Sequence, residues 1–207
     1  MNSQLQHLLH NNPHIWLGDE AQREGVTGLP TGYPSLDAIL PSTGWPKNAL
    51  IEMSTPHWGF GELQLLLPLM RTITQQKRWM LWICPPYIPY APALASAGVD
   101  IDYLVTVDAD TPCKDAMWTM EKALQSHDCG LVLGWLNHLP NGVVRRLQMA
   151  ASEGETLGVL FRNHEVKNSP AALQLRLKHT NQGLHAHVIK ARGANHYRSA
   201  TINLPFH

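Results

Sequence analysis

Two glycines between an apolar run and a leucine-rich run are the first candidates for chemistry. Residues 49–67 read Ala-Leu-Ile-Glu-Met, then Ser-Thr-Pro-His-Trp-Gly-Phe-Gly, then Glu-Leu-Gln-Leu-Leu-Leu. A strand, a glycine-containing loop and a helix in this order are typical of the phosphate-binding loop of nucleotide-binding α/β domains. That loop follows the pattern Gly-x-x-x-x-Gly-Lys-Ser/Thr, in which the lysine contacts the phosphates and the hydroxyl binds Mg²⁺.

The side chains that this chemistry needs are replaced in the present sequence. The glycines are Gly59 and Gly61, and the next two residues are Glu62 and Leu63. A carboxylate at this position would repel a phosphate, and a leucine offers no metal ligand. We therefore expect a degenerate nucleotide site that binds ATP with millimolar affinity or not at all.

Other constellations of reactive residues are weak. His185 and His187 share one face of a predicted strand, but no cysteine or carboxylate pattern accompanies them. Asp108 and Asp110 end a strand, where capping or turn roles are the simpler interpretation. No nucleophile–base spacing is visible. We expect no catalytic residue, no metal and no cofactor, and hence no enzyme.

Composition favours a single cytoplasmic domain. The chain has 207 residues, and its charged residues make up only 15%, against roughly 25% in average soluble proteins. A formal net charge of zero gives no field to hold nucleic acid unaided. The three widely spaced cysteines suit reduced thiols. We see no signal peptide and no apolar run of the ~18 residues that would span a membrane.

The elements that position the loop alternate between strand and helix. We expect strands near 49–53, 78–84, 104–108, 130–136 and 156–162, and helices near 35–40, 62–75, 90–97, 111–126 and 143–152. Ser35 and Thr111 are the expected helix caps. Pro68 would fall inside the second helix, so that helix either kinks there or begins later. The alternation predicts a mostly parallel sheet flanked by helices.

The pattern changes after residue 163. Residues 173–178 and 184–190 alternate with a period of two, and 199–204 is short and β-rich. We expect an antiparallel extension at the sheet edge. The predicted organisation is an N-terminal extension over 1–26, carrying a short helix at 3–10, and a single domain over 27–207. Within that domain the core covers 49–162 and the β extension covers 171–204.

Several short segments of the chain carry a family resemblance, namely 27–37, 44–46, 61–68, 82–86, 90–100 and 151–162. The order of elements resembles the RecA-like fold, and these segments, within a similar stretch of roughly 13–178, resemble the ImuA family, accessory proteins of SOS translesion DNA synthesis. The cell-division inhibitor SulA is similar over a shorter stretch, about 63–162. It lacks the region 27–53, which therefore favours ImuA.

The resemblance implies where the groups for phosphoryl transfer would stand. The lysine and threonine of the phosphate loop fall at Glu62 and Leu63, the general-base glutamate at Pro86, and the metal-side aspartate at Gly134. Charge neutralisation, water activation and metal support are then missing together. A nucleotide-hydrolysing enzyme is the disfavoured third hypothesis.

Aromatic and apolar residues are the candidates for a protein interface. Three tryptophans, Trp45, Trp58 and Trp135, lie near the degenerate site, where they either fill its cavity or anchor a partner. The proline-rich segment 85–90 is a rigid aromatic turn. The candidate interface is the first helix with the strand after it, over 63–83, or else the C-terminal strands. The candidate interface residues are Trp58, Leu66, Trp82, Tyr87 and Tyr90.

Basic residues near the C-terminus are the candidates for DNA contact. A solvated edge face is the favoured interpretation, and a weak phosphate-binding surface is the alternative. Any DNA binding is therefore expected to be weak or indirect. The candidate DNA-contacting residues are Arg176, Lys190, Arg192 and Arg198.

Two functional hypotheses follow from the resemblance. The first is a non-catalytic adaptor that assembles a mutagenic complex with an ImuB-like Y-family polymerase homologue and an error-prone replicative-type DNA polymerase, with RecA as a further candidate partner. The alternative is an SOS cell-division inhibitor of the SulA type, which binds FtsZ and blocks its polymerisation. Self-association through a sheet edge is compatible with both.

Overall fold

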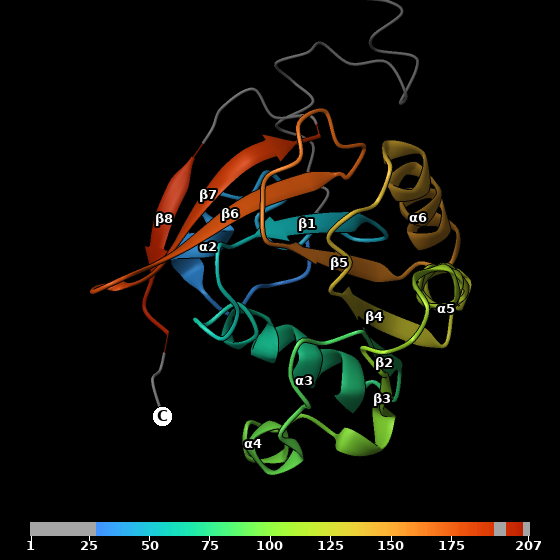
Figure 1. Cartoon of the computed structure of the whole chain (residues 1–207). Helices are drawn as coiled ribbons and strands as arrows, with labels where there is room; N and C mark the ends of the chain where they lie inside the picture. Colours follow the sequence, from blue (N-terminus) through green and yellow to red (C-terminus); the bar gives the residue numbers. More distant parts are fainter. Residues whose placement is uncertain (1–27, 193–197, 205–207) are drawn as a thin grey trace, which may run out of the picture.

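A computed structural model describes residues 28–192 and 198–204 (Figure 1). Their strands form one eight-stranded sheet in the order β3-β2-β4-β5-β1-β6-β7-β8. The predicted helix at 3–10 lies outside the described residues. The strand bounds are β1 Leu50–Ser54, β2 Trp79–Ile83, β3 Leu104–Val107, β4 Cys129–Gly134, β5 Leu157–Arg162, β6 Leu173–Thr180, β7 Gly183–Ala191 and β8 Ser199–Ile202.

The strands β1 to β6 pair in parallel, and β7 and β8 pair antiparallel. The prediction of a mixed α/β fold with a mostly parallel sheet and antiparallel edge strands is confirmed. One detail was wrong: β6, expected within the antiparallel extension, pairs in parallel with β1 on one side, and the antiparallel pairing begins on its other side with β7. Its period-two pattern arises because one face is buried and the other is partly open, which either pairing allows.

Helices cover both faces of the parallel part. Strand residues such as Leu50 and Leu160 pack with α5 and α6, and residues such as Ile51 and Val159 pack with α3 on the opposite face. Two apolar layers therefore enclose the central strands, and Figure 1 shows α3 on one side of the sheet and α5 and α6 on the other. The helix bounds are α2 Pro34–Asp37, α3 Leu67–Gln75, α4 Ala91–Ser96, α5 Cys113–Gln125 and α6 Asn141–Glu153, with 3-10 turns η2 Gln64–Leu66 and η3 Ile101–Tyr103.

Prolines fix where several helices begin. Pro68 stands in the first turn of α3, because a 3-10 turn precedes it and the α-helix begins only at Leu67. A proline is tolerated there, since the N–H that it lacks would have had no partner in the helix. The predicted caps were wrong for the same reason: Tyr33, not Ser35, precedes α2, and Pro112, not Thr111, precedes α5.

Candidate functional site

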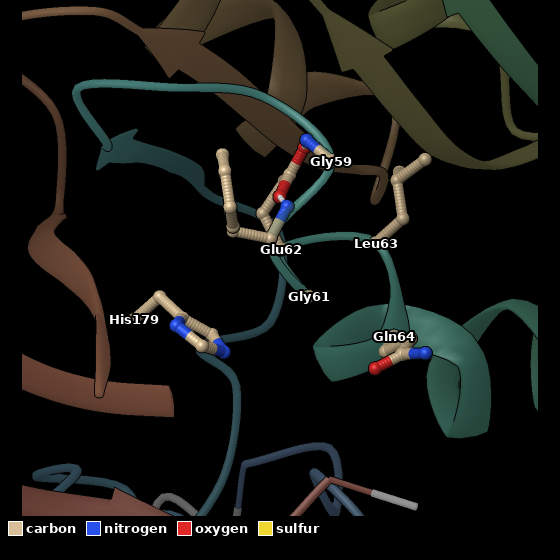
Figure 2. A pocket seen from close by; sticks show the side chains of 7 residues that line it. Gly59, Gly61, Glu62, Leu63, Gln64 and His179 are labelled. Carbon is tan, nitrogen blue, oxygen red and sulfur yellow. Dashed lines mark hydrogen bonds between the residues drawn. The ribbon is translucent and has the colours of Figure 1, made fainter. Parts of the chain in front are cut away.

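The loop between β1 and η2 wraps around the Glu62 side chain. Glu62 is only 4% exposed, and its two carboxylate oxygens accept hydrogen bonds from two consecutive backbone N–H groups. The Gly59 nitrogen lies 2.6 Å from Oε1 and the Phe60 nitrogen 2.9 Å from Oε2, and Figure 2 shows the carboxylate turned back toward Gly59. The backbone donors that a phosphate would need are therefore already occupied.

Both glycines of the loop adopt conformations that favour glycine. Their φ angles are +86° at Gly59 and +105° at Gly61, in the left-handed region that other residues rarely adopt. At Gly61 a Cβ atom would also lie 2.4 Å from Cδ1 of Leu204, beyond β8. The sequence-predicted glycines thus shape the loop and admit the C-terminal segment against it.

A hollow of about 220 Å³ lies beside this loop. Residues 59–64 line it together with His179 of β6 (Figure 2). Phe60 is about half exposed, and its ring lies 6.0 Å from that of His57 and 5.7 Å from that of His179. Among these lining residues the only carboxylate is Glu62, and neither lysine nor arginine occurs. The hollow is therefore poorly suited to a nucleotide triphosphate.

The other two predicted positions of the degenerate site carry no carboxylate. Pro86 is exposed in the segment after β2. Gly134 ends β4, where a Cβ atom would lie 2.9 Å from Sδ of Met120 on α5. The space into which an aspartate side chain would begin to extend is therefore already filled. Within the described residues, no group of three or more His, Cys, Asp or Glu side chains could hold a metal ion.

The tryptophans near the loop pack against core side chains, Trp45 and Trp135 as buried residues and Trp58 as a partly buried one. The Trp58 ring meets the Phe161 ring edge-on with 6.2 Å between the ring centroids, and Trp135 stacks on the same Phe161 ring with 4.7 Å between the centroids. Trp45 and Trp135 are buried in the core. Of the two interpretations of these residues, cavity filling is the one that the contacts support, since aromatic rings occupy the volume beneath the loop.

The interface candidates divide into buried and exposed residues. Leu66 is completely buried and Trp82 is only 2% exposed, so their assignment to a partner surface was wrong. Both belong to the apolar layer between α3 and the sheet. Tyr87 and Tyr90 are 68% and 71% exposed, and Ile88 between them is 94% exposed. The accessible candidates thus converge on the segment that connects β2 to α4.

Most of the basic DNA candidates are engaged within the protein. Arg176 on β6 forms a two-point ion pair with Glu165, and this hydrogen bonding holds the pKa of Glu165 below its usual value. Lys190 donates to the carbonyls of Ser169 and Ala171.

Arg198 donates to the carbonyl of Ala38 at 3.3 Å, and Arg192 is exposed at the end of β7. A continuous phosphate-binding surface would need several free cations. The structure therefore favours the solvated edge face over the DNA-contacting surface.

The structure contains a buried polar cluster that was not predicted from the sequence. Arg162 on β5 donates to Glu52 on β1 through Nη2 at 2.7 Å and Nε at 3.1 Å, and Gln174 on β6 donates to the other Glu52 oxygen at 2.9 Å. All three side chains are buried. A signal was available, because Glu52 and Arg162 are single charges within two otherwise apolar strands.

The family of this chain is shown by its similarity to known proteins. A sequence model of the family described as cell division inhibitor SulA matches residues 57–158. The cell division inhibitor SulA of Edwardsiella piscicida is 34% identical over 119 residues, which are 55% of this chain and 70% of that protein. The chain belongs to the SulA family.

Other SulA proteins match over similar stretches. SulA of Serratia marcescens is 35% identical over 99 residues, or 48% of this chain and 58% of that protein, and SulA of Photorhabdus laumondii is 31% identical over 113 residues, or 55% and 63%. The chain thus spans between 58% and 70% of the length of these three relatives. The crystal structure of SulA from Pseudomonas aeruginosa is 25% identical with a TM-score of 0.46, covering 55% of this chain and 96% of that chain.

The prediction of an ImuA-type translesion adaptor was therefore wrong, and the SulA alternative fits the relatives. Partnership with an ImuB-like protein and an error-prone polymerase has no support among them. The ImuA interpretation depended on residues 27–53. In the structure this region is part of the folded core. Leu29 forms an isolated antiparallel β-bridge with Trp45, and the Trp45 side chain is fully buried in the apolar layer between α3 and the sheet. Core packing is therefore a sufficient explanation for the Trp45 motif in this region.

Proposed function

We propose that this chain inhibits cell division by binding FtsZ and blocking its polymerisation, without catalysis of its own. Identity of 31–35% to proteins described as cell division inhibitors supports the inhibitor class. The loop whose backbone donors are occupied by Glu62 supports a non-enzymatic mode of action. The strand order supports the further proposal that the sheet is RecA-like, and the cytoplasm is the proposed place of action.

The observation that carries a binding function is the exposed segment between β2 and α4. It presents Tyr87, Ile88 and Tyr90 to solvent, and it lies within the part of the chain that the SulA model matches. Large aromatic side chains are the usual anchors of protein interfaces. Large apolar side chains that are exposed close together in the chain, as these three are, form a natural docking surface.

Prolines make this segment a favourable anchor. Pro85, Pro86 and Pro89 lie within it and Pro92 follows in the first turn of α4. Because each proline fixes its own φ angle, the segment has little backbone freedom to lose on binding. Less of the interaction energy with FtsZ is then spent on ordering the chain.

A double substitution tests this surface. We expect Tyr87→Ala/Tyr90→Ala to raise the dissociation constant for FtsZ at least about tenfold, since two anchors are truncated. Inhibition of FtsZ polymerisation, followed by light scattering, should weaken in parallel. Met149→Ala on α6 is the matched control, because Met149 is also an exposed apolar residue, at 65%, and lies far from the segment in sequence.

The outcomes separate the function from the surface. Inhibition by the wild-type chain that is lost in the tyrosine variant and kept in the Met149 variant supports both. Equal inhibition by all three proteins would contradict the assignment of the surface. Absence of inhibition by the folded wild-type chain would contradict the proposed function.

A further inference from the structure

The loop at the degenerate site contains an anion supplied by the chain itself. We propose that Glu62 is an internal ligand, which occupies a backbone anion-binding nest and holds the loop closed without any phosphate. The sequence alone predicts only that Glu62 would repel a phosphate. The structure assigns it the opposite relation to the loop, because its carboxylate takes the position that a bound oxyanion would take.

The contacts have the geometry of anion binding. Consecutive N–H groups that point into one concavity form a nest that binds anions, and here those of Gly59 and Phe60 each donate to a different carboxylate oxygen. Hydrogen bonds to an ionised acceptor are about twice as strong as those between neutral groups. The distance of 2.9 Å from the Phe60 nitrogen lies in the range of about 2.7–2.9 Å expected for such bonds, and the distance of 2.6 Å from the Gly59 nitrogen is slightly shorter.

The two backbone donors are the hydrogen-bond partners that stabilise this buried carboxylate. In the described part of the chain, the ion pairs are Arg146–Glu121, Arg162–Glu52 and Arg176–Glu165, and none includes Glu62. A buried carboxylate without any partner would be costly. The two N–H groups therefore offset the cost of burying the Glu62 carboxylate. In turn, Glu62 accepts hydrogen bonds from two backbone donors that are not paired with a neighbouring strand.

The local sequence brings the carboxylate back to the nest. Glu62 follows Gly59 by three residues, the spacing at which a glutamate side chain returns to the start of a helical turn in a capping box. The left-handed φ angles of Gly59 and Gly61 turn the chain so that the side chain faces the loop. A smaller, uncharged residue at position 62 would leave both donors open.

This arrangement fixes the surface beside the loop. Phe60 is about half exposed between the rings of His57 and His179, and its own backbone N–H is one of the two donors. Because Glu62 and not a phosphate holds the loop closed in this proposal, the position of the Phe60 ring should not depend on phosphate.

Removal of the internal anion should create affinity for an external one. In Glu62→Ala, we expect inorganic phosphate at constant ionic strength to shift the amide ¹⁵N–¹H resonances of Gly59 and Phe60 in a saturable way, with a dissociation constant in the millimolar range. The same titration should leave both resonances unmoved in the wild-type chain. Glu153→Ala is the matched control, because it removes an exposed carboxylate from α6 and leaves the nest occupied.

The wild-type chain offers a second, independent measurement. The Gly59 and Phe60 amide protons should exchange with solvent at least roughly tenfold more slowly than in an unstructured peptide, as expected for hydrogen-bonded amides. This measurement decides the question if Glu62→Ala does not fold. Unprotected amides in the wild type, no response to phosphate in a folded Glu62→Ala, or an equal response in the wild type would each overturn the proposal. None of these readouts involves FtsZ, so failure here is distinct from failure of the proposed function.

Discussion

Cys129 lies at the start of β4 in the apolar layer beneath α5 and α6. Burial raises the pKa of its thiol to about 11, whereas a thiol in an unfolded chain titrates near 8.5. Below pH 8.5 the thiol is neutral in both states and its burial favours folding fully. Between pH 8.5 and 11 the unfolded chain loses the proton while the folded chain keeps it, so stability falls as pH rises.

We therefore predict a steeper alkaline loss of stability in the wild type than in Cys129→Ala. From pH 7.5 to pH 10 the free energy of unfolding should fall by about 2 kcal/mol more in the wild type, which corresponds to the pKa difference over that interval. Urea unfolding at the two pH values measures it. The alanine variant is itself the control for other alkaline groups, and identical slopes would contradict the buried-thiol account.

At the same scale, Glu62 shows the limit of the sequence. Its type and position predicted that the loop could not accept a phosphate as a phosphate-binding loop does. The sequence did not predict that the carboxylate itself would bind the loop. That outcome depends on the φ angles of Gly59 and Gly61, which decide where the N–H groups point.

At the scale of elements, the polar cluster ties three neighbouring strands together. Glu52, Arg162 and Gln174 come from β1, β5 and β6, which connect the helix-covered core to the C-terminal strands. The third Arg162 donor, Nη1, binds the carbonyl of Asn137 at 2.5 Å, and Gln174 also donates to the carbonyl of Val166 at 2.9 Å. With these bonds the buried charges are paired and hydrogen-bonded, as buried charges must be.

We predict that Glu52→Ala lowers the free energy of unfolding by about 3–5 kcal/mol, because Arg162 would be left buried and uncompensated. Urea denaturation measures the change. Glu165→Ala is the control, since it breaks an ion pair of partly exposed side chains whose worth is about 1 kcal/mol or less. A cost for Glu52→Ala no larger than that of the control would show that the cluster does not hold these strands.

The elements themselves were largely readable from the sequence. Strand and helix alternate as predicted because the buried strands are continuous apolar runs and the helices carry one apolar face. The helix starts were less predictable: Pro68 marks a first turn, which became clear only with the preceding 3-10 turn. The pairing of β6 with β1 could not be read either, because its alternating pattern does not encode strand direction.

At the scale of the whole molecule, the sequence motifs limited the family to two candidates, SulA and ImuA, but could not decide between them. Both the SulA and the ImuA resemblance used the segment around 63–162. The choice between them depended on residues 27–53, and the structure shows that this stretch packs Trp45 into the core. Packing motifs identify a fold more reliably than a partner. Relatives with 31–35% identity decided for SulA.

The partner surface could be predicted only in part. The sequence indicated five interface residues, of which Leu66 and Trp82 are buried in the structure, whereas Tyr87 and Tyr90 are exposed. A tryptophan in a strand gives no sign of whether it faces the core of its own chain or a partner. The proline-bracketed segment could be nominated because prolines disfavour regular strands and helices and keep the chain at the surface.

The most direct test of the proposed cell-division inhibition is the effect of the purified wild-type chain on FtsZ polymerisation. FtsZ is polymerised with GTP, the chain is added over a range of concentrations, and the polymer is measured by sedimentation and light scattering. We expect the amount of polymer to decrease with added chain and to be largely lost once the chain is in molar excess over FtsZ. Polymer that remains unchanged in the presence of excess folded chain would contradict it.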